Sequence, residues 1–281
     1  PKGGSMKKAF VQNYNWGPEL EIIRNHRLLF AFREFVVENC PVALEQSNLF
    51  TDENSSSFTL NQKFSAILEL SRAELFENCK SRNYVAYKTS TILENDRITI
   101  QALKHEYRSY LSECVVLYER LAYLLAFLEL CYCSESIDFE DEKHYLHVFF
   151  NPLIFDFRND NSHHRYVVRP KYLEVENLET KIHNQSYQGE LSAQLLEDYL
   201  QKISVLIDED LDWFEYTSRE FAQFFQNFFD SLANKVLVNN KVQIPSSLPV
   251  DLKLDKKITP NFRRKVNHKN LFNEYHSKPE T

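Results

Sequence analysis

The chain has 281 residues and a formal net charge of −7, with 22 Phe and 15 Tyr but only four Gly. Two of the glycines, Gly3 and Gly4, lie in the first five residues, PKGGS, which we interpret as an expression leader before a native start at Met6. The others, Gly17 and Gly189, cannot form a GxGxxG or Walker loop, so dinucleotide-binding and P-loop classes are excluded.

The cysteines and the apolar segments indicate a cytoplasmic protein that does not enter a membrane. The five cysteines are odd in number and most lie in apolar helical patterns, so we expect reduced, buried thiols. No signal peptide follows Met6. The longest apolar run, 121–133, contains Glu129 and falls short of the roughly 20 residues that cross a bilayer.

The first two predicted elements are helices. One begins near Pro18, a residue favoured in the first helical turn, and ends before Pro41. The second is capped by Thr59 and Gln62, which form a T-x-x-Q pattern at its start, and it extends to about Cys79. The stretch that follows, 84–100, is β-branched and aromatic with a turn-like ENDR, which predicts a short hairpin.

The clearest predicted element is a long helix from about Ile100 to Cys133. It has no Gly or Pro, and at 1.5 Å per residue it would be about 50 Å long. Its apolar seam fits packing within the same chain, which we favour, or packing against a partner. The seam residues alternate spacings of three and four: Ile100, Leu103, Tyr107, Tyr110, Cys114, Leu117, Leu121, Leu124, Leu128 and Cys131.

The second half of the chain is also predicted to be helical. An acidic stretch opens a shorter helix that continues through Phe150. Residues 166–188 carry mixed signals, and we expect an excursion from the bundle there. A long helical region follows over about 190–237, with a break expected near 208–212.

These elements predict an all-α fold, a helical bundle with a long central helix and a small irregular or β excursion. We expect one domain over 6–238 and a basic, proline-dotted tail over 239–281, extended or partly disordered. From Lys241 onward nine Lys and Arg face four Asp and Glu, a net charge of +5, so the rest of the chain carries −12. An acidic body argues against a broad basic docking face for nucleic acid.

The densest concentration of phosphate-handling side chains lies in the run NPLIFDFRNDNSHHR. Arg158 is followed by Asn159, then by His163 and His164, and Arg165 ends the run. A guanidinium binds phosphate through two parallel hydrogen bonds, and an imidazole transfers protons near neutral pH. These groups suffice for metal-free cleavage of a phosphodiester. The alternative is a solvated polar turn between two helices.

The R-N-x-x-x-H pattern from Arg158 to His163 resembles the HEPN superfamily, all-helical proteins with an R-x(4–6)-H motif. His164 also falls within that spacing, and Asn159 matches the polar residue that often follows the arginine. The resemblance covers the motif and, loosely, the helices around it. It implies a HEPN-like bundle and a metal-independent endoribonuclease, without a cofactor, that acts on RNA as a homodimer with two motifs at the interface.

The resemblance also implies a biological role and the part each residue plays. Family members serve as toxins or antiviral-defence effectors, so an antitoxin or a nucleotidyltransferase is an expected partner. The RNA 2′-hydroxyl would attack its own phosphodiester, with His163 as general acid or base and Arg158 on the phosphate. Asn159 would orient either group, and His164 and Arg165 are second choices for proton transfer and phosphate binding.

Geometry constrains this hypothesis. On a regular helix Asn159 and His163 share a face, whereas Arg158 lies about 100° away. Arg158 and His163 therefore converge on one phosphate only if the helix begins or kinks here, or if a second copy of the motif supplies the missing group. Asn161 and Ser162 are weak helix formers, which favours an irregular start.

Other constellations are weaker candidates. Cys131 and Cys133 followed by His144 and His147 could bind zinc, but core cysteines and a surface histidine pair account for them better. The acidic runs are interpreted as solvated helix ends. The tail either holds an RNA backbone or serves as a solubilising segment or a strap; its candidate RNA-binding residues are Lys256, Lys257, Arg263, Arg264 and Lys265. The alternative function is a catalytically inactive interaction subunit that uses the long heptad seam.

Overall fold

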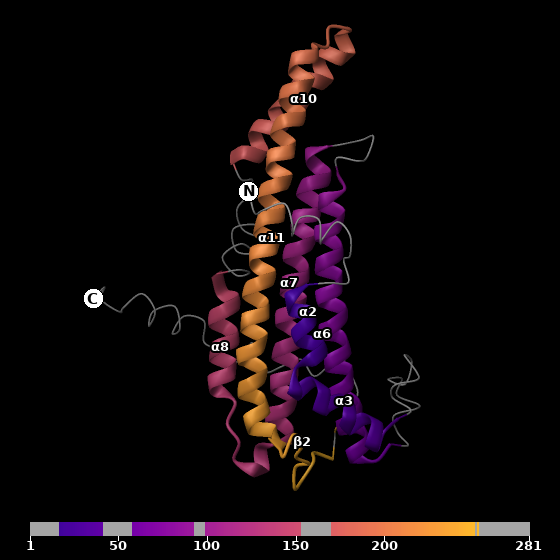
Figure 1. Ribbon diagram of the computed structural model, residues 1–281, viewed down its shortest axis with the longest axis vertical. Helices are drawn as coiled ribbons and strands as arrows, with labels where there is room; N and C mark the ends of the chain where they lie inside the picture. The colour runs from indigo at the N-terminus through magenta and orange to yellow at the C-terminus, as the bar shows by residue number, and fades with distance from the viewer. Residues whose placement is uncertain (1–16, 42–57, 93–98, 153–169, 251, 253–281) are drawn as a thin grey trace, which may run out of the picture.

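The computed structural model describes residues 17–41, 58–92, 99–152, 170–250 and 252 (Figure 1). They form a bundle of long helices and one two-stranded ribbon, which confirms the predicted all-α class. Within these ranges no helix is long and apolar enough to cross a membrane. The elements in chain order are α2 (Pro18–Asn25), α3 (Arg27–Asn39), α6 (Leu60–Ser90), α7 (Ile100–Cys131), the 3-10 turn η2 (Cys133–Glu135), α8 (Glu140–Phe150), α10 (Pro170–Gln188), α11 (Ala193–Val236), β1 (Leu237–Val238) and β2 (Lys241–Val242).

The first predicted helix is two helices, because the chain breaks at His26. This residue has extended backbone angles (φ −66°, ψ 132°), which end α2. Its imidazole Nδ1 then accepts a hydrogen bond of 3.2 Å from the backbone N–H of Leu28 and caps α3. The prediction of one continuous helix was wrong because the apolar pattern runs through the break and does not reveal a histidine cap.

The second helix begins as predicted and ends later than predicted. Thr59 and Gln62 form the capping box at the start of α6. The helix does not end near Cys79 but continues to Ser90, so the predicted hairpin is wrong for the described part of 84–100. Tertiary packing overrides the β propensity of this stretch, because Val85, Ala86 and Thr89 are buried on the inner face of the helix.

The predicted long central helix is confirmed as α7, which has 32 residues and an N-cap at Thr99. Its seam residues are buried and contact other helices of the same chain, mainly α6. The intramolecular alternative is therefore correct, and the heptad seam is not an exposed surface for a partner.

The expected excursion over 166–188 is helical where it is described, and the expected break near 208–212 was wrong. The described part of 166–188 is the helix α10, which packs along the first half of α11. Helix α11 has 44 residues without interruption, so it is about 66 Å long. The acidic residues around Asp210 do not break the helix, because Asp210 is buried and accepts a hydrogen bond from Tyr172 of α10.

The chain after Val238 begins with a hairpin rather than an extended segment. Asn239 and Asn240 both have positive φ (52° and 61°), the geometry of a tight turn between paired strands, and β1 pairs antiparallel with β2. Val242 and Leu252 are buried in the main core. The β excursion therefore lies at the end of α11, and the described part of the expected tail is packed on the bundle.

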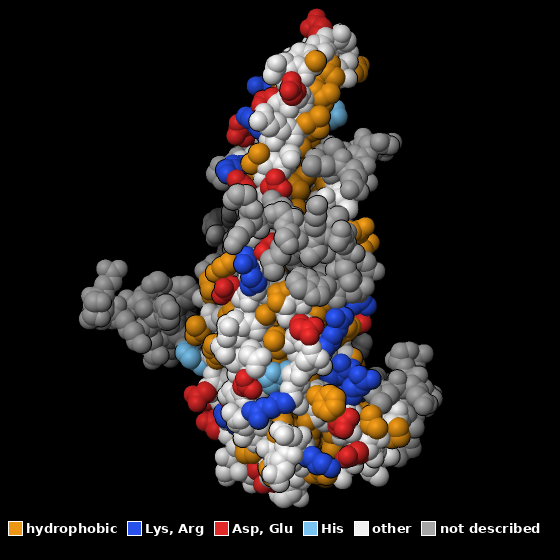
Figure 2. Space-filling model, viewed as in Figure 1, with side chains coloured by type: hydrophobic (Ala, Val, Ile, Leu, Met, Phe, Trp, Pro, Cys, Tyr) orange, Lys and Arg blue, Asp and Glu red, His pale blue; other side chains and the backbone are white. Residues whose placement is uncertain are grey.

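The buried apolar residues form two separate cores. The main core joins α2, α3, α6, α7, α8 and the second half of α11 and is rich in Phe. A smaller core joins α10 and the first half of α11 to the ends of α6 and α7. We call α10 and the first half of α11 the arm; beyond those ends it projects from the bundle as a helical hairpin (Figure 1). Figure 2 shows hydrophobic side chains exposed along this arm.

Candidate functional site

The predicted RNA-cleaving motif lies in the connection between α8 and α10, outside the described residues. The predicted tail contacts to RNA lie outside them too, so the roles of all these side chains stay predictions. The residues concerned are Arg158, Asn159, His163, His164, Arg165, Lys256, Lys257, Arg263, Arg264 and Lys265. The structure does describe the helices at both ends of the connection.

The connection begins where α8 is fixed to the bundle by aromatic packing. The ring of Phe149 stacks on Phe224 of α11, with 4.2 Å between ring centroids and 20° between ring planes. Phe150 is fully buried, and its ring lies 5.5 Å from both Phe221 of α11 and Tyr118 of α7. Such pairs add stability beyond their buried area, so the last turn of α8 is held rigidly.

The connection ends at α10, which polar contacts fix at its first turns. The Tyr172 hydroxyl donates to the buried carboxylate of Asp210, and the Tyr172 ring meets Tyr107 of α7 edge-on at 6.3 Å. Lys104 of α7 donates to Glu176 at 2.7 Å. The motif therefore stands between two helices that are each packed on the same bundle.

The most strongly buried ionic group of the described chain joins three helices. Glu19 of α2 and Arg82 of α6 form an ion pair of 2.7 Å, and both side chains are fully buried. Ser218 of α11 donates to the other carboxylate oxygen of Glu19. A Cβ atom on Gly17 would lie 2.6 Å from Asn83 Nδ2 and 3.0 Å from Glu19 Oε2, so a larger residue here would press on these two buried side chains.

Aromatic rings and thiols enclose Arg82. Its guanidinium carbon lies 3.9 Å from the centre of the Phe221 ring and 5.6 Å from that of Tyr110. Burial raises the pKa of Cys114 to about 11 and also raises the pKa of Cys79 and Tyr110. These groups are thus protonated near neutral pH and are not nucleophiles. We conclude that this cluster holds α2 in the bundle.

Sequence reasoning missed this cluster, although a signal was present. Leu75, Cys79, Arg82, Ala86 and Thr89 follow one another at spacings of four and three, the same seam pattern as in α7. A charge inside such a seam predicts a buried partner of opposite charge. The helix was expected to end near Cys79, so Arg82 was not placed on a buried face.

His26 is a second buried titratable group. Its Nδ1 accepts the N–H of Leu28, so the ring proton is placed on Nε2, which lies 3.3 Å from the Asp230 carboxylate of α11. The ring also packs on Phe229. Burial lowers the pKa of His26, and the nearby Asp230 carboxylate only partly offsets that effect. His26 is therefore neutral near pH 7 and serves as a helix cap.

The weaker metal candidates do not converge. Cys131 is buried in the core, whereas Cys133 is exposed. No group of three or more His, Cys, Asp or Glu side chains in the described ranges is arranged to hold a metal ion.

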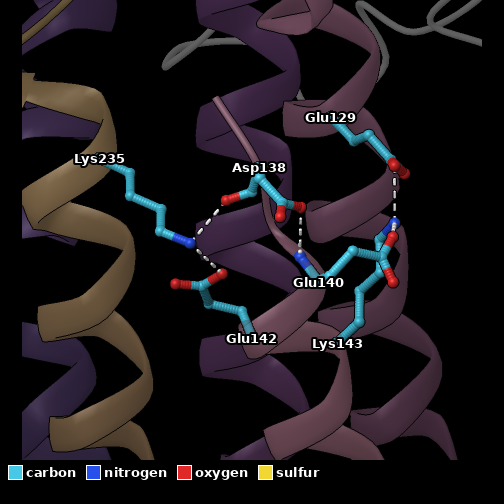
Figure 3. A network of polar contacts seen from close by, with 6 residues as sticks. All are labelled: Glu129, Asp138, Glu140, Glu142, Lys143 and Lys235. Carbon is cyan, nitrogen blue, oxygen red and sulfur yellow. Dashed lines mark hydrogen bonds and ion pairs between the residues drawn. The ribbon is translucent and has the colours of Figure 1, made fainter. Parts of the chain in front are cut away.

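The acidic first turn of α8 instead makes ion pairs at the end of the bundle (Figure 3). Lys235 of α11 donates to the buried carboxylate of Glu142 at 2.6 Å and also to the Asp138 carbonyl. Lys143 pairs with Glu129 and Glu140. These contacts tie α8 to α7 and α11.

Comparison with known proteins adds no relative. No family model, no curated protein and no solved structure matches this chain.

Proposed function

We propose that the protein is a metal-independent endoribonuclease of the HEPN type. The observation that carries the proposal is the R-N-x-x-x-H pattern from Arg158 to His163, in the connection between two helices of an all-α chain. The helices on both sides of the connection are packed on the bundle.

In the proposed reaction the 2′-hydroxyl of RNA attacks the adjacent phosphorus, and the 5′-oxygen of the next nucleotide leaves. His163 transfers the proton, and Arg158 stabilises charge on the non-bridging oxygens. Asn159 orients these groups, and His164 and Arg165 assist. Because Arg158 and His163 diverge on a regular helix, two copies of the motif at a homodimer interface complete one site. The products are a 2′,3′-cyclic phosphate and a 5′-hydroxyl.

The test is cleavage of single-stranded RNA by the full chain in the presence of EDTA. We expect cyclic-phosphate products from the wild type, none from Arg158→Ala or His163→Ala, and partial activity from His164→Ala. His105→Ala is the matched control, since His105 is an exposed histidine of α7 far along the chain from the motif. Activity that appears only with added magnesium, or survives in both motif variants, would refute the proposed mechanism.

A catalytically inactive interaction subunit is the second candidate. The heptad seam of α7 is buried, so such a function would use another surface. The arm provides one, because Leu191, Leu196 and Leu200 are each 40% exposed and Tyr187 is 95% exposed. A wild-type protein that binds partners through the arm but never cleaves RNA would favour this second function.

A further inference from the structure

The corner between α2 and α3 depends on the imidazole of His26. Its Nδ1 accepts the backbone N–H of Leu28 at 3.2 Å, and its carbonyl accepts the N–H of Phe30 at 2.9 Å. Most N-caps are Ser, Thr, Asp or Asn, whose side-chain oxygens accept a hydrogen bond throughout the neutral pH range. An imidazole nitrogen accepts one only while it carries no proton. The cap of α3 therefore depends on the charge state of a single side chain.

The opposite edge of the imidazole faces an acid. Nε2 lies 3.3 Å from the Asp230 carboxylate of α11, but the two groups are not aligned for a hydrogen bond. Asp230 also accepts a hydrogen bond of 2.7 Å from Gln226, and its side chain is 45% exposed. This carboxylate can therefore adjust to a charged imidazole without disturbing the core.

The ring itself cannot gain a charge without a structural response. It is buried and packs on Phe229 with 5.6 Å between ring centroids, and Leu28 and Leu29 in the first turn of α3 are buried in the main core. With a proton on Nδ1, two N–H groups would face each other across the 3.2 Å that now joins Nδ1 to the Leu28 nitrogen. The imidazole and the Leu28 amide must then separate.

Two charged residues act on the imidazole from neighbouring elements. Burial has the largest effect and disfavours the protonated form, Asp230 of α11 favours it, and Arg27 of α3 disfavours it. The charged residues that precede His26 on α2 have partners of their own on α2 and α6: Glu21 and Arg24. The balance lowers the pKa of His26 below 6.5, so the cap is complete above pH 6.5 and is lost as pH falls through the folded pKa.

We propose that His26 is a pH-sensitive switch for the corner between α2 and α3. In the neutral state the imidazole caps α3. In the protonated state, reached by taking one proton from solvent, Nε2–H forms an ion pair with Asp230 and the Leu28 amide loses its acceptor. Protonation replaces a bond within the corner by a bond from the corner to α11, so the first turn of α3 loosens.

The change is local, because both helices have other anchors. Helix α2 is held by the fully buried ion pair between Glu19 and Arg82, and α3 packs along α6. Loss of one cap shifts a local opening equilibrium about fivefold, which loosens a turn without unfolding a bundle. The inference goes beyond the proposed RNA cleavage and does not rest on it, since His26 lies far along the chain from the motif.

The experiment measures hydrogen exchange of the Leu28 and Phe30 amides by NMR on the full chain between pH 7 and pH 5. Rates are expressed as protection factors, which remove the intrinsic pH dependence of exchange. We expect the protection of both amides to fall about fivefold along the titration curve of the His26 imidazole, while amides in the middle of α7 keep theirs. His26→Asn retains a capping oxygen and should show no fall. His105→Asn, at an exposed histidine of α7, is the matched control and should behave as the wild type.

Two further variants change the charges and leave the cap in place. Asp230→Asn removes the acid that favours the protonated imidazole, so the transition should move to lower pH. Arg27→Gln removes the cation that disfavours it, so the transition should move to higher pH. Both side chains are 45% exposed, so these variants test the switch even if His26→Asn does not fold.

Several results would overturn the inference. They are an imidazole that stays neutral down to pH 5, an imidazole that titrates without any change at Leu28, and an equal loss of protection in α7, which would mean global unfolding. Shifts of the two charge variants in the same direction would contradict the exchange of the cap for the Asp230 ion pair. RNA cleavage assayed at pH 7, where the cap is intact, tests the proposed function separately, so either proposal can fail alone.

Discussion

The bundle and the arm are built from the same kind of helix but are held together differently. In the bundle, α2, α6 and α11 meet around a fully buried ion pair, which the rings of Phe221 and Tyr110 enclose. In the arm, α10 and α11 share a small core and are joined by ion pairs such as Lys202 with Glu174, whose side chains are 37% and 59% exposed. Buried charges depend on their partners, whereas exposed ones are screened by water. The bundle should therefore fail as a unit and the arm should open locally.

The largest effect is expected from Arg82→Met. The variant leaves the Glu19 carboxylate buried without its cation, and breaking a buried pair in this way costs about 3–5 kcal/mol. Urea unfolding followed by circular dichroism measures the loss. The double variant Glu19→Gln with Arg82→Met should recover part of it, because no charge is then left unpaired. Equal losses in the single and double variants would show that Glu19 does not depend on Arg82.

A smaller loss is expected from Gly17→Ala. The added methyl group would lie 2.6 Å from Asn83 Nδ2, and Asn83 is buried, so either its side chain or α2 must shift. Overpacking of this kind costs about 1–3 kcal/mol. The arm offers the contrast, because Gly189 has φ +74° and no atom within 4 Å of an added Cβ. Gly189→Asn should leave global unfolding unchanged, since asparagine tolerates positive φ.

A pH-dependent effect is expected at His26. Its folded pKa is lowered below the ordinary value of 6.5, so stability is fully present above pH 6.5 and is lost as pH falls through the folded pKa. Protonation places a hydrogen on Nδ1, which can then no longer accept the N–H of Leu28. His26→Asn keeps a capping oxygen that does not titrate, so the fall in unfolding free energy from pH 7 to pH 5 should be smaller.

The Asp230 carboxylate does not contribute to the change in unfolding free energy between pH 7 and pH 5. Its pKa is lowered from 3.8, so it titrates below this pH range. His105→Asn, at an exposed position, is the control and should leave the pH profile unchanged. A wild-type profile that stays flat between pH 7 and pH 5 would contradict the assignment of His26 as a neutral cap.

Periodicity predicted the parts of the fold that depend on one repeating face. The seam of α7 and the capping box of α6 both appear where the sequence places them, because spacing and local hydrogen bonding specify them. The break at His26 and the length of α6 were mispredicted. Both depend on contacts with segments distant in the sequence. His26 contacts Asp230 of α11, and the β-branched end of α6 packs against α7.

The candidate site, too, could be predicted only in part from the sequence. The R-N-x-x-x-H pattern can be recognised from residue types alone, since the chemistry of phosphate binding and proton transfer restricts which residues are useful. Its convergence into a site cannot be predicted from spacing, because Arg158 and His163 diverge on a regular helix.

The smallest effect on global stability is expected in the arm, from Lys202→Ala. Lys202 pairs with Glu174, and both side chains are partly exposed, so ordering two long side chains offsets most of the attraction. The urea midpoint should therefore stay within error of the wild type. Hydrogen exchange should still respond, because amides of 193–203 in the arm open without global unfolding and lose one cross-link between α10 and α11. Faster exchange confined to the arm is the expected result. A lowered urea midpoint would instead show that the arm and the bundle unfold together.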